Sequence, residues 1–288
     1  MGRAAAKTGI MPTALVAIEQ SFPPSQRIIE DALALRMLPP EGRMFVGLLR
    51  LRFLRDWLIG VAEKSDPGMW GGLLSRKRFI DDRIATSRDA IEAVVSLGAG
   101  FDPRSFRLPS LAGVPIWEID QRENIEAKEK RLRQALGDIP GNVRLVAVDF
   151  DHEDPGAKLA LQGYSMSLRT FFVWEGVTQY LTEAGVRATM GWLEQAAPGS
   201  RLAFTYVRRR FLKGEALYGW ESGYRRFVKT GVWRFGMEPE DCPAFLREYG
   251  WELMEELSYE ELGRRWFGPT GRTLAATEVE RMVYAEKR

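Results

Sequence analysis

The chain has 288 residues, and 45% of them are hydrophobic, so it is long enough to bury the core of one large domain. Its 41 basic and 39 acidic residues nearly cancel, which gives no electrostatic reason to expect a nucleic-acid partner. One cysteine, Cys242, and one histidine, His152, are too few for an intramolecular disulfide or a Cys/His zinc site, and we predict no metal site.

The sequence predicts no membrane partner and no export signal. Its longest uncharged stretch near the N-terminus, residues 8–18, is shorter than the ~20 apolar residues of a membrane-spanning helix. This stretch also lacks the ordered basic, apolar and small-residue regions of a signal peptide. Because a lone thiol suits a reducing compartment, we expect a cytoplasmic protein.

The first third of the chain is predicted to be helical. Residues 28–38 carry apolar side chains close to a helical period, and the two prolines at 39 and 40 are expected to end that helix. A second helix is expected over residues 43–62. Its predicted apolar face consists of Phe45, Leu48, Leu49, Phe53, Trp57 and Leu58.

A change of pattern follows this helical region. Residues 66–72 are rich in glycine and are expected to form a loop. We therefore predict a helical annex or lid over residues 1–75 and a main domain over residues 76–288.

From residue 79 onward, short apolar runs alternate with helical segments. The runs expected to form strands are residues 93–97, 114–119, 143–148, 170–174 and 201–206. The expected helices are residues 81–91, 124–136, 155–162 and 182–196. Such alternation indicates βαβ units and a parallel sheet that helices cover on both faces. Two final runs, residues 251–257 and 279–286, have no full helix between them, which suggests an antiparallel edge pair and completes a seven-stranded Rossmann-like α/β fold.

A glycine turn, Gly98-Ala99-Gly100, follows the first expected strand. Glycine lets a ligand approach the backbone at the carboxyl end of a strand. The next strand ends in Asp120, 22 positions after Gly98, the spacing at which a carboxylate bonds ribose hydroxyls. Alternatively, Asp120 caps the following helix. The turn and the carboxylate together predict a ligand that contains a nucleoside.

A dinucleotide such as NAD is disfavoured, although it would use the same two features. Its fingerprint has a third glycine three residues after the second, and this chain has Pro103 there. The third strand instead ends in Asp149-Phe150, a pair that suits an adenine base through its exocyclic amine and its flat face. The fourth strand ends in Glu175, which is expected near a cationic part of the ligand.

Five ordered segments resemble the leucine carboxyl methyltransferase family, and in particular its actinobacterial branch of O-methyltransferases. These segments are Arg76–Asp81, Leu97–Arg104, Trp117–Gln121, Val148–Phe150 and Trp174–Leu181. The later segments Gly236–Asp241, Gly250-Trp251 and Arg281–Lys287 extend the resemblance over residues 76–287. It implies a seven-stranded methyltransferase fold that uses S-adenosylmethionine and releases S-adenosylhomocysteine.

The resemblance also implies the cofactor site. Its residues are Arg76, Gly98, Ala99, Gly100, Asp120, Gln121, Asp149, Phe150 and Glu175. In the family pattern, Arg76 binds the methionine carboxylate, Asp120 the ribose and Glu175 the methionine amino group. The family's usual Arg-Thr pair reads Arg76-Lys77 here, and the N-terminal lysine motif of the phosphatase-directed members has no counterpart. The second departure argues against a protein C-terminus as the substrate.

The segment at about 207–245 interleaves aromatic and basic residues between the fifth and sixth strands. We predict a lid or pocket wall for an aromatic, acidic small molecule, with ordinary helix packing as the alternative. The candidate substrate residues are Tyr180, Tyr206, Arg209 and Arg225. For Tyr180, a place in the core is the alternative.

The expected activity is O-methylation of a carboxylate or phenol on a small molecule of secondary metabolism, such as a polyketide. No catalytic residue is assigned, because a carboxylate is already ionised at neutral pH. The alternatives are protein carboxyl methylation, or a methyltransferase-like protein that uses the cofactor as a scaffold for cyclisation or ligand binding.

Overall fold

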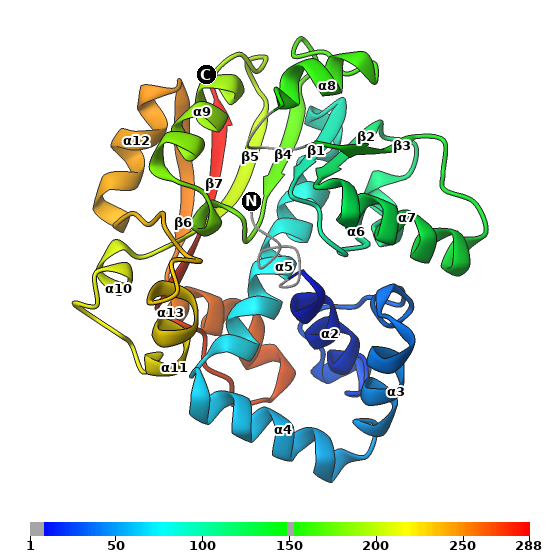
Figure 1. Ribbon diagram of the computed structural model, residues 1–288, viewed down its shortest axis with the longest axis vertical. Coiled ribbons are helices and arrows are strands. Elements are labelled where there is room, and N and C mark those ends of the chain that lie inside the picture. Colours follow the sequence, from blue (N-terminus) through cyan, green and yellow to red (C-terminus); the bar gives the residue numbers. More distant parts are fainter. Residues whose placement is uncertain (1–8, 149–152) are drawn as a thin grey trace.

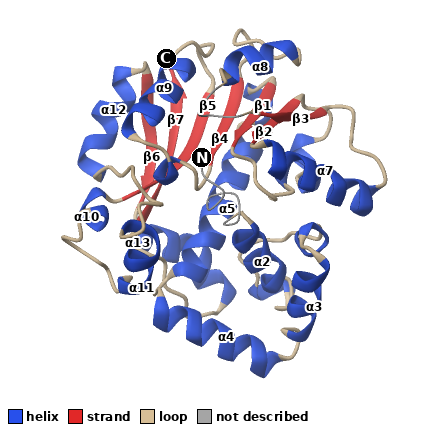
Figure 2. Ribbon diagram, viewed as in Figure 1, coloured by secondary structure: helices blue, strands red, loops and turns tan. Residues whose placement is uncertain are grey.

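The computed structural model describes residues 9–148 and 153–288. Its centre is one seven-stranded sheet of order β3-β2-β1-β4-β5-β7-β6, which appears as a continuous red layer among helices in Figure 2. The strands are β1 (Ala93–Leu97), β2 (Ile116–Asp120), β3 (Val143–Ala147), β4 (Thr170–Trp174), β5 (Arg201–Val207), β6 (Trp251–Leu257) and β7 (Glu280–Lys287). Strands β1 to β5 are parallel, whereas β7 runs antiparallel to both β5 and β6. The predicted α/β fold is confirmed.

Twelve described helices surround or extend this sheet (Figure 1). They are α2 (Ile10–Glu19), α3 (Pro40–Leu48), α4 (Arg52–Ser65), α5 (Met69–Thr86), α6 (Arg104–Arg107), α7 (Arg122–Leu136), α8 (Pro155–Leu161), α9 (Glu183–Leu193), α10 (Arg209–Leu212), α11 (Glu221–Gly223), α12 (Cys242–Glu248) and α13 (Tyr259–Leu262). Among the described residues, we find no helix with the length and apolar character of a membrane span.

The sheet separates two apolar cores. Successive side chains of a strand point to opposite faces, so Phe171 and Phe172 of β4 enter different cores, and both are completely buried. Phe171 packs with α5 and the N-terminal helices, whereas Phe172 packs with α8, α9 and α12. Burial on both faces explains why the parallel strands read as continuous apolar runs in the sequence.

The N-terminal region departs from the predicted helices. Residues 28–38 contain only a short 3₁₀ turn, Ala34–Met37, because the Asp31 carboxylate accepts hydrogen bonds from the N–H groups of Leu33 and Ala34 at 2.9 and 2.8 Å. Such a side-chain bond offers the backbone an alternative to the helix. The second of the two prolines begins α3, where a missing N–H costs nothing.

The predicted helix over residues 43–62 is wrong in its continuity and in part of its buried face: Leu49 is buried and Leu58 packs against the core as predicted, but other residues of that face do not. The segment divides into α3 and α4, and Phe53 and Trp57 are 69% and 67% exposed. Arg55 is the buried residue instead. Its guanidinium lies 3.7 Å from the Phe22 ring centre and donates to the Ser21 carbonyl at 3.1 Å. This contact buries Arg55 alone of the arginines of α4, and the Arg52 side chain on the same helix is 87% exposed.

The predicted loop over residues 66–72 is largely the start of α5, which also includes most of the predicted helix over residues 81–91. Gly71 lies inside α5 because a chain segment crosses it closely: a Cβ atom there would be 2.1 Å from the Ala275 carbonyl oxygen. α5 contacts α2 and α4 as well as β7. The predicted boundary between residues 75 and 76 therefore falls within a helix that packs against both regions.

Candidate functional site

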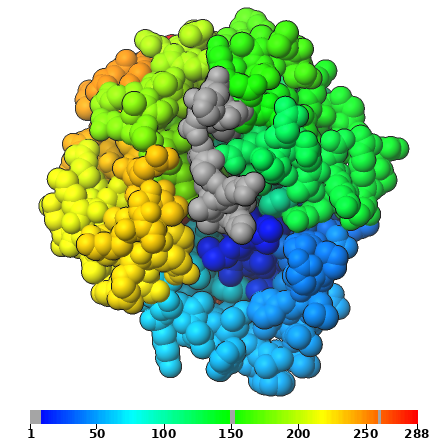
Figure 3. Space-filling model, viewed as in Figure 1, coloured from blue at the N-terminus to red at the C-terminus, as the bar shows by residue number. Residues whose placement is uncertain are grey.

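A cavity of about 380 Å³ lies at the carboxyl ends of β1, β2 and β4. Gly98, Gly100, Asp120 and Glu175 line its sheet side, and Gly9, Met11, Pro12 and Thr13 at the start of α2 line it from the annex. Figure 3 shows the first described residues, in deep blue, at the centre of one face of the molecule. The remaining walls come from α5 and from the segment between β5 and β6. Parallel α/β sheets bind their ligands at this edge.

The glycine turn opens space for a ligand. Gly98 has a φ of +73°, and a Cβ atom there would lie 2.5 Å from Cγ2 of Val177. Gly100 has a φ of +47°, and nothing lies within 4 Å of its corresponding Cβ position. Any side chain at Gly100 would therefore project into open space beside the cavity.

Asp120 ties this turn to the end of β2. Its Oδ2 accepts a hydrogen bond from the Gly100 N–H at 2.7 Å, and its Oδ1 accepts from the Gln121 N–H and the Asn124 side chain at 2.7 and 2.8 Å. Helix α7 has no side-chain cap hydrogen bond, so the capping alternative for Asp120 is wrong. A carboxylate has about four acceptor sites, and described residues use three of those of Asp120. The described part of the chain therefore leaves one for a ligand.

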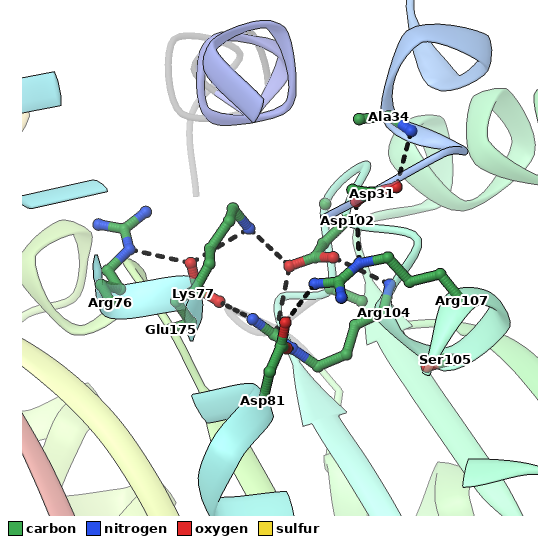
Figure 4. Close-up of polar contacts among 12 residues, drawn as sticks. Asp31, Ala34, Arg76, Lys77, Asp81, Asp102, Arg104, Ser105, Arg107 and Glu175 are labelled. Carbon is green, nitrogen blue, oxygen red and sulfur yellow. Dashed lines mark hydrogen bonds and ion pairs between the residues drawn. The ribbon is translucent and has the colours of Figure 1, made fainter. Parts of the chain in front are cut away.

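Glu175 lies in a buried ionic cluster at the end of β4 (Figure 4). Its Oε1 accepts from Nε of Arg76 at 2.9 Å and lies 3.2 Å from Nζ of Lys77. Its Oε2 accepts from Nη2 of Arg104 at 2.9 Å. Arg76 also donates through Nη1 to Glu280 of β7 at 2.8 Å. The cluster thus joins α5, the start of α6, the end of β4, and β7.

A second set of ion pairs connects this cluster to the annex. Arg104 donates to Asp81 of α5 at 2.7 Å, and Arg107 donates to the other oxygen of Asp81 at the same distance. Nε of Arg107 lies 2.9 Å from the Asp31 carboxylate, which also bonds the backbone at Leu33 and Ala34. A continuous line of charged side chains therefore runs from the annex to the cavity.

The cluster keeps its carboxylates ionised. Burial opposes the charge of Glu175, but Lys77, Arg104 and Arg76 outweigh it and lower its pKa to about 2. Burial likewise opposes the charge of Asp102, and nearby cations, Arg104 first, hold its pKa well below the usual range. For Asp31 burial prevails over Arg107, and the pKa rises to about 6. Both Glu175 and Asp102 are therefore weak bases at neutral pH.

Acid is expected to destabilise the protein as Glu175 takes up a proton. The pKa of Glu175 is about 2 in the folded state and 4.5 ordinarily, so the unfolded chain binds more protons between these values. The contribution of Glu175 to the free energy of unfolding is then fully present above pH 4.5. Below that pH it falls by up to about 1.4 kcal/mol per pH unit. Asp31 has the opposite effect on the free energy of unfolding. Because its pKa is raised from 3.8 to about 6 in the folded state, its contribution to stability is lost as the pH rises through about 6.

Urea unfolding at about pH 6, 4.5 and 3 tests this expectation. We expect a marked fall in the unfolding midpoint only between the last two values. The Glu175→Gln variant, which cannot take up this proton, should show a shallower fall over the same interval. Equal midpoints at pH 4.5 and 3 for the wild type would contradict the ionised cluster.

Aromatic side chains form the wall opposite the glycine turn. Phe227 and Trp233 stack with ring centres 4.6 Å apart and planes 8° apart, and Tyr180 meets Trp233 edge-on at 6.4 Å. Arg226 also lines the cavity, lies over the Phe227 ring and pairs with Asp66, which follows α4. The segment between β5 and β6 therefore supplies a flat apolar surface with a cation at its edge.

The structure brings most of the predicted cofactor residues together. Those that line the cavity are Arg76, Gly98, Ala99, Gly100, Asp120, Gln121 and Glu175. The predicted adenine pair, Asp149 and Phe150, lies outside the described residues, as does His152. Of the candidate substrate residues, Tyr180 lines the cavity.

The other three candidate substrate residues are not among those that line the cavity in the described part of the chain. Tyr206 is buried in the sheet and donates its hydroxyl hydrogen bond to Glu256, because its position on β5 points into the core with Phe204. Arg209 pairs with Asp241 near the surface, and Arg225 is exposed. Neither arginine is among the described residues that line the cavity. These three predictions are corrected accordingly.

Sequence reasoning missed charged and polar residues that line the cavity, among them Lys77, Asp102, Arg104, Gln179 and Glu280. Four further lining residues, Trp220, Arg226, Phe227 and Trp233, lie in the segment predicted as a lid or pocket wall but were not among the candidate substrate residues. The charged residues that follow the glycine turn in the sequence were a usable signal for the cavity lining, because charged residues at the end of a predicted strand often face a ligand. For the segment between β5 and β6, the aromatic and basic composition correctly predicted a cavity wall, but the wrong arginine was chosen. The segment contains a π-helical turn, Tyr224–Val228, which changes the helical register and so the side chains that face the cavity.

Comparisons with known proteins agree with this geometry. A family model described as leucine carboxyl methyltransferase matches residues 9–194. A protein from Mycolicibacterium paratuberculosis, named "Putative S-adenosyl-L-methionine-dependent methyltransferase", is 30% identical over 74% of this chain and 75% of its own. A Mycolicibacterium smegmatis protein of the same description is 39% identical over 66% of each chain.

Solved structures share the fold at low sequence identity. A DUF574 family protein from Streptomyces avermitilis has a TM-score of 0.58 at 14% identity, with 80% of this chain and 88% of that chain covered. A structure from Thermobifida fusca described as a "putative methyltransferase" has a TM-score of 0.57 at 17% identity, with 81% and 88% covered.

Proposed function

The chain belongs to the leucine carboxyl methyltransferase family, and from that membership we propose that it methylates an oxygen atom of a small molecule. Dependence on S-adenosylmethionine follows from its relatives. The proposed acceptor is a carboxylate or a phenolic hydroxyl of a natural product, such as a polyketide, and S-adenosylhomocysteine is the second product. One observation carries the proposal: a single cavity joins the nucleoside-type site at Gly100 and Asp120 to the aromatic wall of Phe227 and Trp233.

The described residues fit the cofactor. Described residues use three of the about four acceptor sites of Asp120 and likewise of Glu175, so each can accept one more hydrogen bond, Asp120 from a ribose hydroxyl and Glu175 from an ammonium group. Arg76 uses Nε and Nη1 on described carboxylates, which leaves Nη2 for the methionine carboxylate. Gly100 provides the open approach beside them.

The cofactor supplies a methyl group on a positively charged sulfur, so the protein's task is alignment. The stacked rings of Phe227 and Trp233 would hold a flat acceptor against one wall. Arg226 would attract its negative charge at the edge of that wall. Gly9 and the residues 11–13 of the annex would limit the access of water from the other side.

A carboxylate suits this site better than a phenol. A phenol needs a base near neutral pH, and two of the carboxylates at the cavity are weak bases: the pKa of Glu175 is about 2, and that of Asp102 is well below its ordinary value. Both shifts come from paired cations that outweigh burial. A carboxylate acceptor arrives ionised and needs no proton transfer.

The formation of S-adenosylhomocysteine from S-adenosylmethionine tests the proposal. Aromatic carboxylic acids and phenols are compared with a peptide that ends in a free leucine carboxylate. Turnover of the small acids alone supports the proposed function. Turnover of the peptide alone would favour protein carboxyl methylation, and binding without turnover of any acceptor would favour a scaffold role.

Removal of one ring from the wall is expected to weaken acceptor binding. The Phe227→Ala variant loses the ring that stacks on Trp233 at 4.6 Å. We expect KM for the acceptor to rise about tenfold, as one aromatic contact contributes roughly 0.5–1.5 kcal/mol beyond its buried area. The affinity for S-adenosylhomocysteine should stay within about twofold of wild type. An unchanged KM would exclude this wall as the acceptor site.

A further inference from the structure

Two buried polar atoms at the aromatic end of the cavity have no hydrogen-bond partner among the described residues. They are Oε1 of Gln179 and Nε1 of Trp233. Their side chains are only 4% and 9% exposed, and both residues line the cavity. Buried polar groups in folded proteins are almost always paired, so two unpaired atoms on one cavity wall need an explanation.

A backbone hydrogen bond holds these two residues in the same part of the cavity wall. Gln179 lies in the short turn after β4, and its carbonyl accepts a hydrogen bond of 2.7 Å from the N–H of Arg234, the residue after Trp233. This hydrogen bond joins two parts of the chain that are more than fifty residues apart in the sequence. This one backbone contact therefore brings the segments that carry the two side chains together.

The Trp233 ring is also held by its neighbours. It stacks on Phe227 at 4.6 Å, and Tyr180 and Phe211 pack against it at 6.4 and 6.0 Å. Because these rings surround it, the indole cannot turn to find another acceptor for its N–H. Its donor direction is therefore fixed before any ligand arrives, which is the property of a preorganised recognition group.

We propose that Gln179 and Trp233 recognise the polar substituents of the methyl acceptor, an aromatic acid that carries a ring hydroxyl. The Gln179 amide accepts a hydrogen bond from the hydroxyl, and the Trp233 indole donates one to an oxygen of the acceptor. This inference rests on the proposed function and adds the acceptor class to it. The aromatic wall contacts the ring, while the two polar groups select among rings of similar size.

The first test separates recognition from support of the fold. The Gln179→Leu variant removes the unpaired amide and keeps a side chain of similar size. If the amide serves a ligand, its removal should raise the melting temperature of the ligand-free protein by about 2–4 °C, since an unsatisfied buried group is lost. Gln195→Leu makes the same chemical change at an exposed position and should leave the melting temperature unchanged. A lower melting temperature for Gln179→Leu would overturn the proposal.

The second test measures selectivity with named probes. Protein saturated with S-adenosylhomocysteine is titrated with 2-, 3- and 4-hydroxybenzoate and with benzoate. We expect at least one hydroxybenzoate to bind the wild type about tenfold more tightly than benzoate, and we expect Gln179→Leu to abolish that advantage. Trp233→Phe, which keeps a ring and removes the N–H, should weaken all four probes. Equal binding of benzoate and every hydroxybenzoate, or an unchanged advantage in Gln179→Leu, would overturn the inference.

Failure of this inference differs from failure of the proposed function. If wild type and Gln179→Leu methylate hydroxylated and plain aromatic acids at equal kcat/KM, the protein is an O-methyltransferase and only the recognition pair is rejected. If neither protein forms S-adenosylhomocysteine with any acid or phenol while both bind it, the proposed function itself is rejected.

Discussion

Replacement of Glu175 by alanine is expected to lower the free energy of unfolding by about 3–5 kcal/mol, because it leaves buried cations without their shared partner. The Glu175 carboxylate is 8% exposed and contacts Arg76, Lys77 and Arg104 at 2.9, 3.2 and 2.9 Å. Asp102 and Glu280 partly compensate these cations, but neither can occupy the place of Glu175. Urea unfolding monitored by circular dichroism measures the change.

The matched control is Glu183→Ala. Glu183 also pairs with an arginine, Arg187, at 3.1 Å, but its side chain is 69% exposed. Exposed pairs contribute little, so we expect a change within about 0.5 kcal/mol. A loss below about 1 kcal/mol for Glu175→Ala would mean that the ionic cluster does not support the fold around the cavity.

Replacement of Asp120 by alanine is expected to weaken the binding of S-adenosylhomocysteine by about 1–3 kcal/mol, or roughly 5- to 150-fold. The variant loses one charge-assisted acceptor for the ribose. It also releases the N–H of Gly100, which Asp120 holds at 2.7 Å, so the glycine turn is less well ordered before binding. Isothermal titration calorimetry measures the affinity directly.

Two further variants test whether the loss of affinity is specific to the Asp120 carboxylate. Asp120→Asn keeps one acceptor oxygen without the charge and should fall between wild type and alanine. Asp138→Ala removes an exposed carboxylate just beyond α7 and should bind as wild type does. Wild-type affinity for Asp120→Ala would reject the assignment of Asp120 to the cofactor.

The sequence was sufficient to predict the sheet. The limits of β1, β4 and β6 match the predicted runs, because each run is bounded on both sides by polar or glycine positions. Prediction failed in the annex, where single side chains override the periodicity. Asp31 bonds the backbone in place of a helix, and Arg55 is buried on Phe22 while Trp57 is exposed.

Only one part of the candidate site could be predicted from the sequence, namely the part formed by the ends of the parallel strands. Carboxylates and glycines at the ends of neighbouring parallel strands meet at one sheet edge, and that rule placed Gly100, Asp120 and Glu175 correctly together. The opposite wall depends on contacts between distant parts of the chain. Glu280 reaches Arg76 across 204 positions, and no local pattern at Trp233 reveals that it faces Tyr180.

The central claim is that this cavity binds S-adenosylmethionine. Calorimetric titration of the wild-type protein with S-adenosylmethionine, S-adenosylhomocysteine and NAD tests it most directly. We predict micromolar binding of the first two at one site per chain and no detectable binding of NAD. Binding of NAD without either sulfur compound would contradict the account, because the turn at Gly98 and Gly100 would then belong to a dinucleotide site.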